Sequence, residues 1–518
     1  MRLPIWNLVF PLSLTWLFQI HSSYRYSLVS EFPDLDSQDL DSMDAKDTVE
    51  SRKVQSLKSK LFHLCLLEQQ STGSSSVPYV PRDSSPRKYN ELNYQWNTRK
   101  GVIQPLGYYI PKETPDVQNA IFCGRRLGIR VVPKGGGHSM EKYSFGDSGS
   151  VIIDLRNLSS IHVDSVQKTA VVGAGTLMGP LAWALWINGG FGIGGGLCGT
   201  VGVAGYTMGG AYGFWGKRFG MAADRVLEME MVDADSHVHV VNAAKNKDLF
   251  WALLGAGGGN FEIVTSFKFK LVHFEPFRVT YIVNHYTPDM FLQVFTEWQT
   301  FNYAERKNGL YPRLTVGDAL ITLEIVDVDL SAAQVQHLKE SFPSPPPNLK
   351  DSASLSTISY LELVARVNSE PILKDPSELG RINRIDDSRV SIRTKSYYSS
   401  KVLSSSEIES LRVIFNIMPD QANMTVIFYP YGEAVNRIPP NATAFVHRNA
   451  LLDALVLPTT LIGETEGTKT KVINWIKQFD GVARKILDNG ESYQNHIDGE
   501  LKSSSLYMAR YYGPNSED

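Results

Sequence analysis

Two side chains that could form covalent bonds lie in an unusually glycine-rich part of the sequence. His138 follows three consecutive glycines, and Cys198 is also surrounded by glycines. Glycine costs conformational entropy, so its dense use usually reflects close approach of the backbone to a ligand, with N–H groups directed at phosphates or at a planar ring. A nucleophilic imidazole and a thiol on such loops predict the covalent attachment of a flat ligand.

Glycine recurs throughout the stretch between residues 135 and 260, at 135–137, 173, 175, 194–196, 199, 202, 205, 209–210, 213, 255 and 257–259. The segment 194–199 formally matches the GxGxxG fingerprint of dinucleotide-binding loops. No strand clearly precedes it in a β-turn-α unit, and no acidic residue follows at the distance of a ribose ligand, so a Rossmann site is the weaker interpretation. A surface loop without a ligand is a further alternative, which the regular recurrence of glycine disfavours.

The N-terminus has the pattern of a secretory signal peptide. Arg2 precedes an apolar run over residues 5–20, and the next charged residue is Arg25. We expect a signal peptide over residues 1–23, with cleavage within 21–27. The alternative is a membrane anchor that is never cleaved, which the prolines and polar residues inside the run disfavour.

Secretion would make the sequons available for glycosylation and would place the cysteines in an oxidising environment. Asn157, Asn423 and Asn441 each begin an Asn-x-Ser/Thr sequon and are expected to be glycosylated. The chain has three cysteines, at positions 65, 123 and 198. In an oxidising compartment, one disulfide and one odd thiol is the simplest arrangement.

Length and charge limit the function classes. The 518 residues suffice for two or more domains with their own cores. The formal net charge is −3, and Lys and Arg are scattered along the chain. A nucleic-acid-binding protein would need a clustered basic face, so we expect no nucleic-acid partner.

The glycine clusters are embedded in an α/β pattern that begins near Tyr108. Thr114 is expected to cap a helix that has Pro115 in its first turn and Gly128 at its end. Strands are expected at 129–132, 151–155 and 169–172, an apolar helix at 177–187, a β-hairpin at 226–232 and 237–241, a short helix at 248–254 and a half-buried strand at 267–271.

The character of the sequence changes after about residue 275, where glycine becomes rarer. Strands are expected at 279–283, 319–326 and 424–428, and helices at 290–300, 332–341, 406–415 and 469–487, which indicates a second α+β domain. Residues 24–60 are predicted to be a disordered acidic spacer.

Several of these motifs together resemble the berberine bridge enzyme-like proteins, FAD-linked oxidoreductases with the vanillyl-alcohol-oxidase or PCMH-type fold. The resemblance covers roughly residues 61–513 and rests on an ordered set of motifs: VPKGGGHS (132–139) and YSFG (143–146), GLCGTVGVAG (196–205), GGAYG (209–213) and GMAADRV (220–226), DLFWALLG (248–255) and GGGNFEIVT (257–265), AFVHR (444–448) and YQNHID (493–498).

The resemblance implies an α+β fold with three parts. A PCMH-type FAD-binding domain of two α/β subdomains would occupy residues 61–275. A substrate domain with an antiparallel sheet covered by helices would occupy 276–490. A C-terminal segment, 491–518, would return to the FAD domain; it stops earlier than in most members and so looks truncated.

The resemblance also implies covalent FAD. His138 would bond the flavin 8α-methyl carbon and Cys198 ring carbon 6, which leaves Cys65 and Cys123 to form the disulfide; two free buried thiols are the alternative. The other residues expected to bind FAD lie in the same motifs: Lys134, Gly135, Gly136, Gly137, Ser139, Tyr143, Gly199, Thr200, Val201, Gly202, Gly205, Tyr206, Gly209, Gly210, Gly259, Ile263 and Val264. No metal site is expected.

The implied reaction is hydride transfer from a substrate carbon to flavin N5, after which O2 is reduced to H2O2. Tyr493 matches the active-site tyrosine and would take the hydroxyl proton, although a phenol needs a lowered pKa to act as a base. An ordinary buried tyrosine is the alternative for Tyr493. Val201 occupies a position where valine accompanies oxygen access in the family, which favours an oxidase, although it could simply be a packing residue.

Three positions depart from the family pattern. Tyr206 replaces a histidine that contacts the flavin in relatives, Ala211 replaces a glycine, and His496 replaces a tyrosine. We expect a secreted, monomeric flavoprotein that oxidises a sugar, an oligosaccharide or a specialised metabolite. The alternatives are a flavin-binding protein with impaired or no activity, and a dehydrogenase that uses another electron acceptor.

Overall fold

The computed structural model describes residues 49–69, 77–275, 277–347, 349, 353–367, 375–382, 390–419, 424–461, 465–501 and 503–514. The chain divides into a unit of residues 1–58 and a unit of residues 59–518, and the sheets and the site described below belong to the second unit. The expected signal peptide and the sequon at Asn423 lie outside the described residues.

The prediction of a disordered spacer over residues 24–60 is wrong for residues 49–60. These residues form the first part of helix α3 (Val49–Gln69). The acidic composition of residues 28–48 obscured a change of pattern, because Val54, Leu57 and Leu61 recur at helical spacing.

The first sheet of the second unit has four strands in the order β1-β2-β4-β3. Strands β2 (Gly107–Tyr109), β4 (Val151–Asp154) and β3 (Val131–Lys134) run parallel, and β1 (Tyr79–Pro81) is antiparallel to β2. Helix α5 (Thr114–Leu127) connects β2 to β3, and a short helix, α4 (Pro86–Leu92), lies between β1 and β2 in the chain. The cap of α5 is Glu113, in a reciprocal capping box with Asp116, and not Thr114 as predicted, while Gly128 ends the helix at a φ of 64°.

The second sheet has five strands in the order β5-β6-β10-β8-β9, and all its pairs are antiparallel. The strands are β5 (Ile161–Asp164), β6 (Thr169–Gly173), β8 (Val226–Asp233), β9 (Val238–Asn242) and β10 (Glu262–Lys270). The helices between them in the chain are α6 (Met178–Ile187), α7 (Val203–Met208), α8 (Gly216–Phe219) and α9 (Lys247–Leu253). Parallel strands are therefore found in the first sheet and not in this one. A small pair, β7 (Phe191–Gly192) and β11 (Val272–His273), lies beside the chain leading to Cys198.

The third large sheet is antiparallel and has seven strands in the order β15-β12-β14-β13-β18-β19-β17. In chain order they are β12 (Val279–Tyr286), β13 (Tyr311–Gly317), β14 (Ile321–Val328), β15 (Ala353–Ile358), β17 (Lys395–Ser399), β18 (Thr425–Pro430) and β19 (Leu452–Val456). A two-stranded pair, β16 (Val390–Ile392) and β20 (Thr459–Leu461), lies apart from it.

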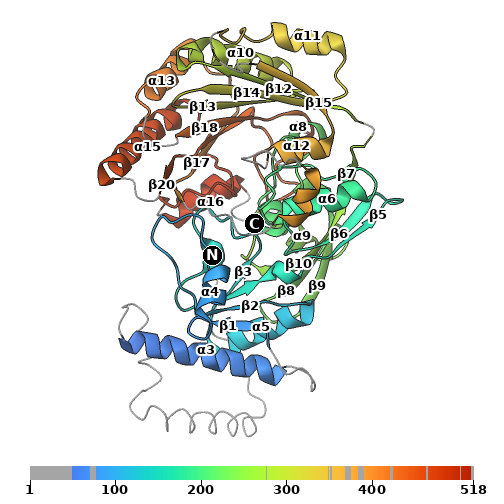
Figure 1. The fold of residues 1–518 in the computed structure, drawn as a ribbon, viewed down its shortest axis with the longest axis vertical. Coiled ribbons are helices and arrows are strands. Elements are labelled where there is room, and N and C mark those ends of the chain that lie inside the picture. Colours follow the sequence, from blue (N-terminus) through green and yellow to red (C-terminus); the bar gives the residue numbers. More distant parts are fainter. Residues whose placement is uncertain are drawn as a thin grey trace. The chain divides into compact units, whose positions relative to one another are not determined.

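Each face of the seven-stranded sheet has its own core. One face packs against α10 (Phe291–Ala304), α11 (Ala332–Glu340), α13 (Ser405–Phe415) and α15 (Glu466–Ile486), which Figure 1 shows along one side of the sheet. The other face shares a core with residues 212–215 and with α12 (Tyr360–Val367). The expected α+β class, with a large antiparallel sheet covered by helices, is confirmed.

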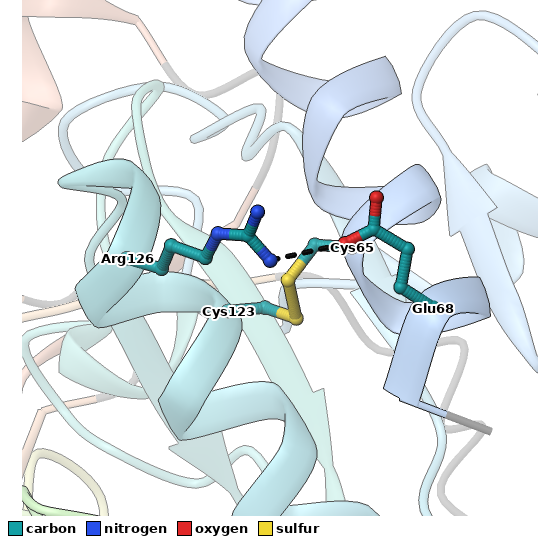
Figure 2. The surroundings of a disulfide bond; sticks show 4 residues. All are labelled: Cys65, Glu68, Cys123 and Arg126. Atoms are coloured by element: carbon teal, nitrogen blue, oxygen red, sulfur yellow. Dashed lines mark hydrogen bonds and ion pairs between the residues drawn. A yellow bond between two sulfur atoms is a disulfide. The ribbon is translucent and has the colours of Figure 1, made fainter. Parts of the chain in front are cut away.

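The disulfide expected between Cys65 and Cys123 is present and joins α3 to α5. Figure 2 shows it beside an ion pair between Glu68 and Arg126, whose atoms lie 3.0 Å apart. The alternative of two free thiols at these positions is thereby excluded.

The C-terminal segment ends in helix α16 (Ser504–Tyr512). The Tyr512 hydroxyl donates to the Ala256 carbonyl at 2.9 Å, in the glycine-rich segment that precedes β10. Arg510 pairs with Asp488 at 2.9 Å and 3.1 Å. The segment is thus held both at the glycine-rich loop before β10 and at the end of α15.

Among the described helices, none combines the length and apolar character needed to cross a bilayer.

Candidate functional site

A cavity of about 710 Å³ lies where the glycine-rich loops meet the seven-stranded sheet and the C-terminal segment. Its volume falls within the range of small-molecule and cofactor sites. The wall formed by the glycine-rich loops includes most of the residues predicted to bind the cofactor: Gly135, Gly136, Gly137, His138, Ser139, Tyr143, Cys198, Val201, Gly202, Gly205, Tyr206, Gly259 and Val264. The other wall includes Tyr311, Arg313, Tyr429, Asp453, Tyr493 and His496.

The two side chains predicted to form covalent bonds line this same cavity. His138 lies on the loop after β3, is partly exposed, and has its ring centroid 5.7 Å from that of Trp96. Cys198 lies on the segment between β7 and α7, is exposed, and is the free cysteine of the described chain. Its Sγ atom lies 3.8 Å from the Thr200 hydroxyl, at the limit of a weak hydrogen bond.

The histidine loop and the cysteine loop touch each other through their backbones. A Cβ atom added to Gly136 would lie 2.3 Å from the Gly202 nitrogen, and one added to Gly202 would lie 2.2 Å from the Gly136 nitrogen. Gly205, in contrast, would meet nothing within 4 Å. Some of the glycines therefore allow two chain segments to touch, and others leave open space that a ligand could occupy.

Six of the residues predicted to bind the cofactor do not line the cavity: Lys134, Gly199, Thr200, Gly209, Gly210 and Ile263. Lys134 is buried, and its ammonium donates to the Leu92 carbonyl at 2.6 Å and pairs with Asp154 at 3.3 Å. Gly209 and Gly210 pack under Asn495 and Phe445, because a Cβ atom there would lie 2.0 Å and 2.9 Å from these side chains. Lys134, Gly209 and Gly210 therefore contact other parts of the protein and not the cavity.

Five buried polar atoms on the cavity wall have no hydrogen-bond partner among the described residues: Ser144 Oγ, Glu262 Oε1, Asp453 Oδ1, Gln494 Oε1 and His496 Nδ1. Buried polar groups in folded proteins are almost always bonded, so such a cluster indicates a polar ligand. Asp453 is not among the site residues predicted from the sequence. Its only signal was a lone carboxylate in the otherwise apolar strand β19, whose residues are all buried.

Glu262 contributes an unusual carboxyl group to this wall. Burial raises its pKa to about 7, although the N–H groups of Phe261 and Gly259 oppose the shift. A carboxyl in this state can donate as well as accept a hydrogen bond near neutral pH.

Tyr493 is held by two donors. Its hydroxyl oxygen accepts hydrogen bonds from the Tyr212 N–H at 3.1 Å and from the Asn495 side-chain amide at 3.0 Å. Burial raises its pKa to about 12, and the two hydrogen bonds act in the opposite direction. The His496 ring stands edge-on to the Tyr493 ring at 4.8 Å, and its Nδ1 atom is 3.7 Å from the Asp453 carboxylate.

Two contacts join motifs that are far apart in the sequence. Arg448 pairs with Asp224 through two bonds of 2.7 Å and 3.0 Å, and both side chains are buried. The Tyr206 hydroxyl donates to the Tyr212 carbonyl at 2.6 Å and accepts a hydrogen bond from the Gly196 N–H. The Gly-rich and C-terminal motifs thus form one connected site.

Comparison with known proteins agrees with this geometry. A family model described as "FAD binding domain" matches residues 105–242. Berberine bridge enzyme-like 9 of Arabidopsis thaliana is 28% identical over 388 residues, which are 71% of this chain and 71% of the relative. Monolignol oxidoreductase AtBBE-like 13 of Arabidopsis thaliana is 26% identical over 419 residues, 77% of this chain and 76% of the relative.

Solved structures with the same fold cover most of both chains. Physcomitrella patens BBE-like 1 superposes with a TM-score of 0.77 at 28% identity, over 88% of this chain and 93% of that one. A grass pollen allergen with glucose dehydrogenase activity, Phl p 4, has a TM-score of 0.77 at 22% identity, over 88% and 94%. A chitooligosaccharide oxidase has a TM-score of 0.76 at 21% identity, over the same shares.

Proposed function

Because the chain belongs to the berberine bridge enzyme-like family of FAD-dependent oxidoreductases, we propose that it is a secreted oxidase in which both His138 and Cys198 are bonded to FAD. The substrate would be an alcohol of a sugar, an oligosaccharide or a specialised metabolite. The observation that carries this proposal is that an imidazole and a thiol, sixty positions apart in the chain, line one cavity.

The cavity fits a flavin cofactor in three respects. Its glycine wall leaves open space at Gly205, where a Cβ atom would meet nothing. Within the described part of the chain, Ser144 Oγ, Glu262 Oε1 and Gln494 Oε1 have no hydrogen-bond partner. Its two candidate attachment atoms are accessible, since Cys198 is exposed and His138 is partly exposed. When bound, the flavin would accept a hydride and pass the electrons to O2.

Tyr493 is the residue best placed to take the proton of the reacting hydroxyl. Two N–H donors already point at its oxygen, and such donors stabilise a phenolate. The pKa of about 12 in the protein alone means that this stabilisation is not sufficient by itself. We infer that the bound cofactor and substrate supply the rest of the shift.

The substrate wall favours a hydroxylated ligand. Asp453 Oδ1 and His496 Nδ1 have no hydrogen-bond partner among the described residues, and both atoms can bond hydroxyl groups. Arg313 contributes no free charge, because its guanidinium is paired with Glu324 at 2.8 Å. Relatives are named for activity on glucose, chitooligosaccharides and monolignols. We therefore propose a sugar as the first candidate substrate and an alcohol of a specialised metabolite as the second.

Three features support secretion. The Cys65–Cys123 disulfide is typical of an oxidising compartment. Asn157 and Asn441 are both exposed and thus accessible to glycosylation. The apolar N-terminal run adds the signal expected of a secreted chain.

The test of the proposed function is the fate of the yellow colour on acid precipitation. We expect the colour to stay with the pelleted wild-type protein and with each single variant, His138→Ala or Cys198→Ala, and to leave the pellet only in the double variant. Complete release of colour from the wild type would refute covalent attachment. Peroxide formation with glucose, chitobiose and coniferyl alcohol then distinguishes an oxidase from a dehydrogenase, which would reduce only an added electron acceptor, and from a protein without activity.

A further inference from the structure

The hydroxyl of Tyr206 lies directly under the loop that carries Cys198. It accepts a hydrogen bond from the Gly196 N–H and donates one to the Tyr212 carbonyl at 2.6 Å. A Cβ atom added to Gly196 would lie 2.6 Å from this hydroxyl, and one added to Gly195 would lie 3.2 Å from it. The loop backbone therefore rests on the phenol oxygen, two residues before the thiol.

The phenol ring is itself well fixed. The ring packs against a core that includes residues of the four-stranded and five-stranded sheets. The backbone of Tyr206 is part of helix α7. Burial raises the pKa of Tyr206 well above its ordinary value. The hydroxyl therefore stays protonated and keeps its hydrogen bond to the Tyr212 carbonyl at any ordinary pH. Its two hydrogen bonds thus connect the cysteine loop to the turn that also supplies the N–H bonded to Tyr493.

The loop is also held on the other side of Cys198. The Val201 N–H donates to the Cys198 carbonyl at 3.3 Å, and the Gly179 N–H donates to the Gly199 carbonyl at 2.9 Å. The thiol thus projects from a short stretch that is anchored at Gly196 on one side and at Gly199 on the other. These anchors fix the backbone from which the Cys198 side chain projects, and the contact of Sγ with Thr200 adds only a weak constraint.

We propose that Tyr206 is a positioning residue that aims the Cys198 thiol at the flavin ring for formation of the sulfur–carbon bond. This inference rests on the proposed covalent attachment of FAD. Tyr206 does not itself take part in the bond. The two hydrogen bonds of the Tyr206 hydroxyl reach Gly196 and Tyr212, which both lie outside the histidine loop, so we expect the bond to His138 to form without Tyr206.

The bond-forming step balances with O2 as the oxidant. The Sγ–H bond of Cys198 and the C–H bond at ring carbon 6 break, and one sulfur–carbon bond forms. The two electrons and two protons released pass by way of the ring to O2, which becomes H2O2. The rate of such a step depends steeply on the position of the sulfur atom, because a displacement of about 1 Å can lower the rate about 100-fold.

The test is Tyr206→Phe, which removes both hydrogen bonds and keeps the ring. After tryptic digestion, mass spectrometry gives the fraction of the Cys198 peptide and of the His138 peptide that carries flavin, at matched times of incubation in air. We expect the Cys198 fraction to fall at least about tenfold and the His138 fraction to stay at the wild-type level. Tyr286→Phe is the matched control, because the Tyr286 hydroxyl also donates to a carbonyl, that of Pro343 at 3.0 Å, and also accepts from an N–H group, that of Asn284 at 3.2 Å.

A second variant perturbs the same contact from the loop. Gly196→Ala introduces a methyl group against the Tyr206 hydroxyl and should also lower the Cys198 fraction. Its control is Gly481→Ala in α15, where a Cβ atom would meet nothing within 4 Å. If Tyr206→Phe does not fold, Gly196→Ala decides the question.

The outcomes separate this inference from the proposed function. Equal Cys198 fractions in the wild type, Tyr206→Phe and Gly196→Ala would overturn the role of Tyr206 and leave covalent attachment at both residues intact. An unmodified Cys198 in the wild type would overturn the proposed attachment and this inference with it. Parallel loss of flavin from both peptides would show a general structural role and would overturn the specific one.

Discussion

At the scale of single residues, the cavity brings together an imidazole, an exposed thiol and a phenol whose oxygen accepts two hydrogen bonds. The motifs identified His138, Cys198 and Tyr493, and all three line the cavity. Lys134 was expected to bind the cofactor, but its charge is neutralised by Asp154. Asp453 could not be found from sequence, because its position on the wall depends on the register of β19 with its neighbours.

The first prediction concerns proton transfer. Tyr493→Phe should lower the rate of flavin reduction by substrate by about 10²- to 10⁴-fold, because a positioned acid–base group contributes that much. Stopped-flow absorbance under anaerobic conditions measures this rate. Flavin content should be unchanged, and a wild-type rate in the variant would exclude Tyr493 as the base.

The second prediction concerns the substrate wall. Asp453→Asn should lower kcat/KM for the best sugar substrate by about 10- to 100-fold, which corresponds to about 1–3 kcal/mol for one hydrogen bond to a charged group. Steady-state kinetics on the purified variant checks this. A change in flavin content instead of kcat/KM would assign Asp453 to the cofactor side of the cavity.

The third prediction concerns pH. The folded-state pKa of Glu262 is raised to about 7 from an ordinary 4.5, so the folded protein holds a proton that the unfolded chain has lost between these pH values. Glu262 therefore destabilises the fold progressively as pH rises from about 4.5 to 7. Glu262→Gln should be more stable than the wild type by up to about 3 kcal/mol at pH 8 and equal to it near pH 4. Denaturant titrations at both pH values test this, and a pH-independent difference would contradict it.

At the scale of elements, helices and strands were largely predictable while their pairing was not. The helix expected at 332–341 is α11 (Ala332–Glu340), and the strand expected at 151–155 is β4 (Val151–Asp154). Periodicity is local, so it shows in the sequence. The order of the seven-stranded sheet depends on contacts such as Tyr429 opposite Asp453, which no local pattern encodes. Strands β17 and β19 were missed because all their residues are buried, which removes the alternation that marks a half-buried strand.

The fourth prediction concerns the link between α3 and α5. Replacing Cys65 and Cys123 together by serine should lower the free energy of unfolding by about 2–5 kcal/mol, because the cross-link no longer restricts the unfolded chain. Thermal or denaturant unfolding of the variant measures the loss. Glu68→Gln is the control, because its ion pair with Arg126 beside the disulfide is exposed and should contribute at most about 1 kcal/mol.

At the scale of the whole molecule, the site draws on three separate regions of the chain. The glycine-rich loops, the strands of the seven-stranded sheet and residues 493–497 each supply part of one cavity wall. The motif resemblance predicted that these regions belong together. It could not give the contacts that hold them, of which the buried Arg448–Asp224 pair is one.

The fifth prediction tests this connection. Arg448→Met should cost about 3–5 kcal/mol of stability, because it leaves the Asp224 carboxylate buried without its partner. Arg130→Met is the control, since both side chains of its pair with Asp147 are exposed and the pair should contribute about 0–1 kcal/mol. Denaturant unfolding measures the loss of stability in both variants. Equal losses would show that the Arg448–Asp224 pair contributes no more to stability than an exposed pair.

The backbone contact between Gly136 and Gly202 has one more consequence. Since neither position has room for even a methyl group, main-chain atoms hold the loop that carries His138 against the loop that carries Cys198. Side chains on the opposite wall of the cavity can therefore diverge to suit new substrates without loosening the contact between these two loops.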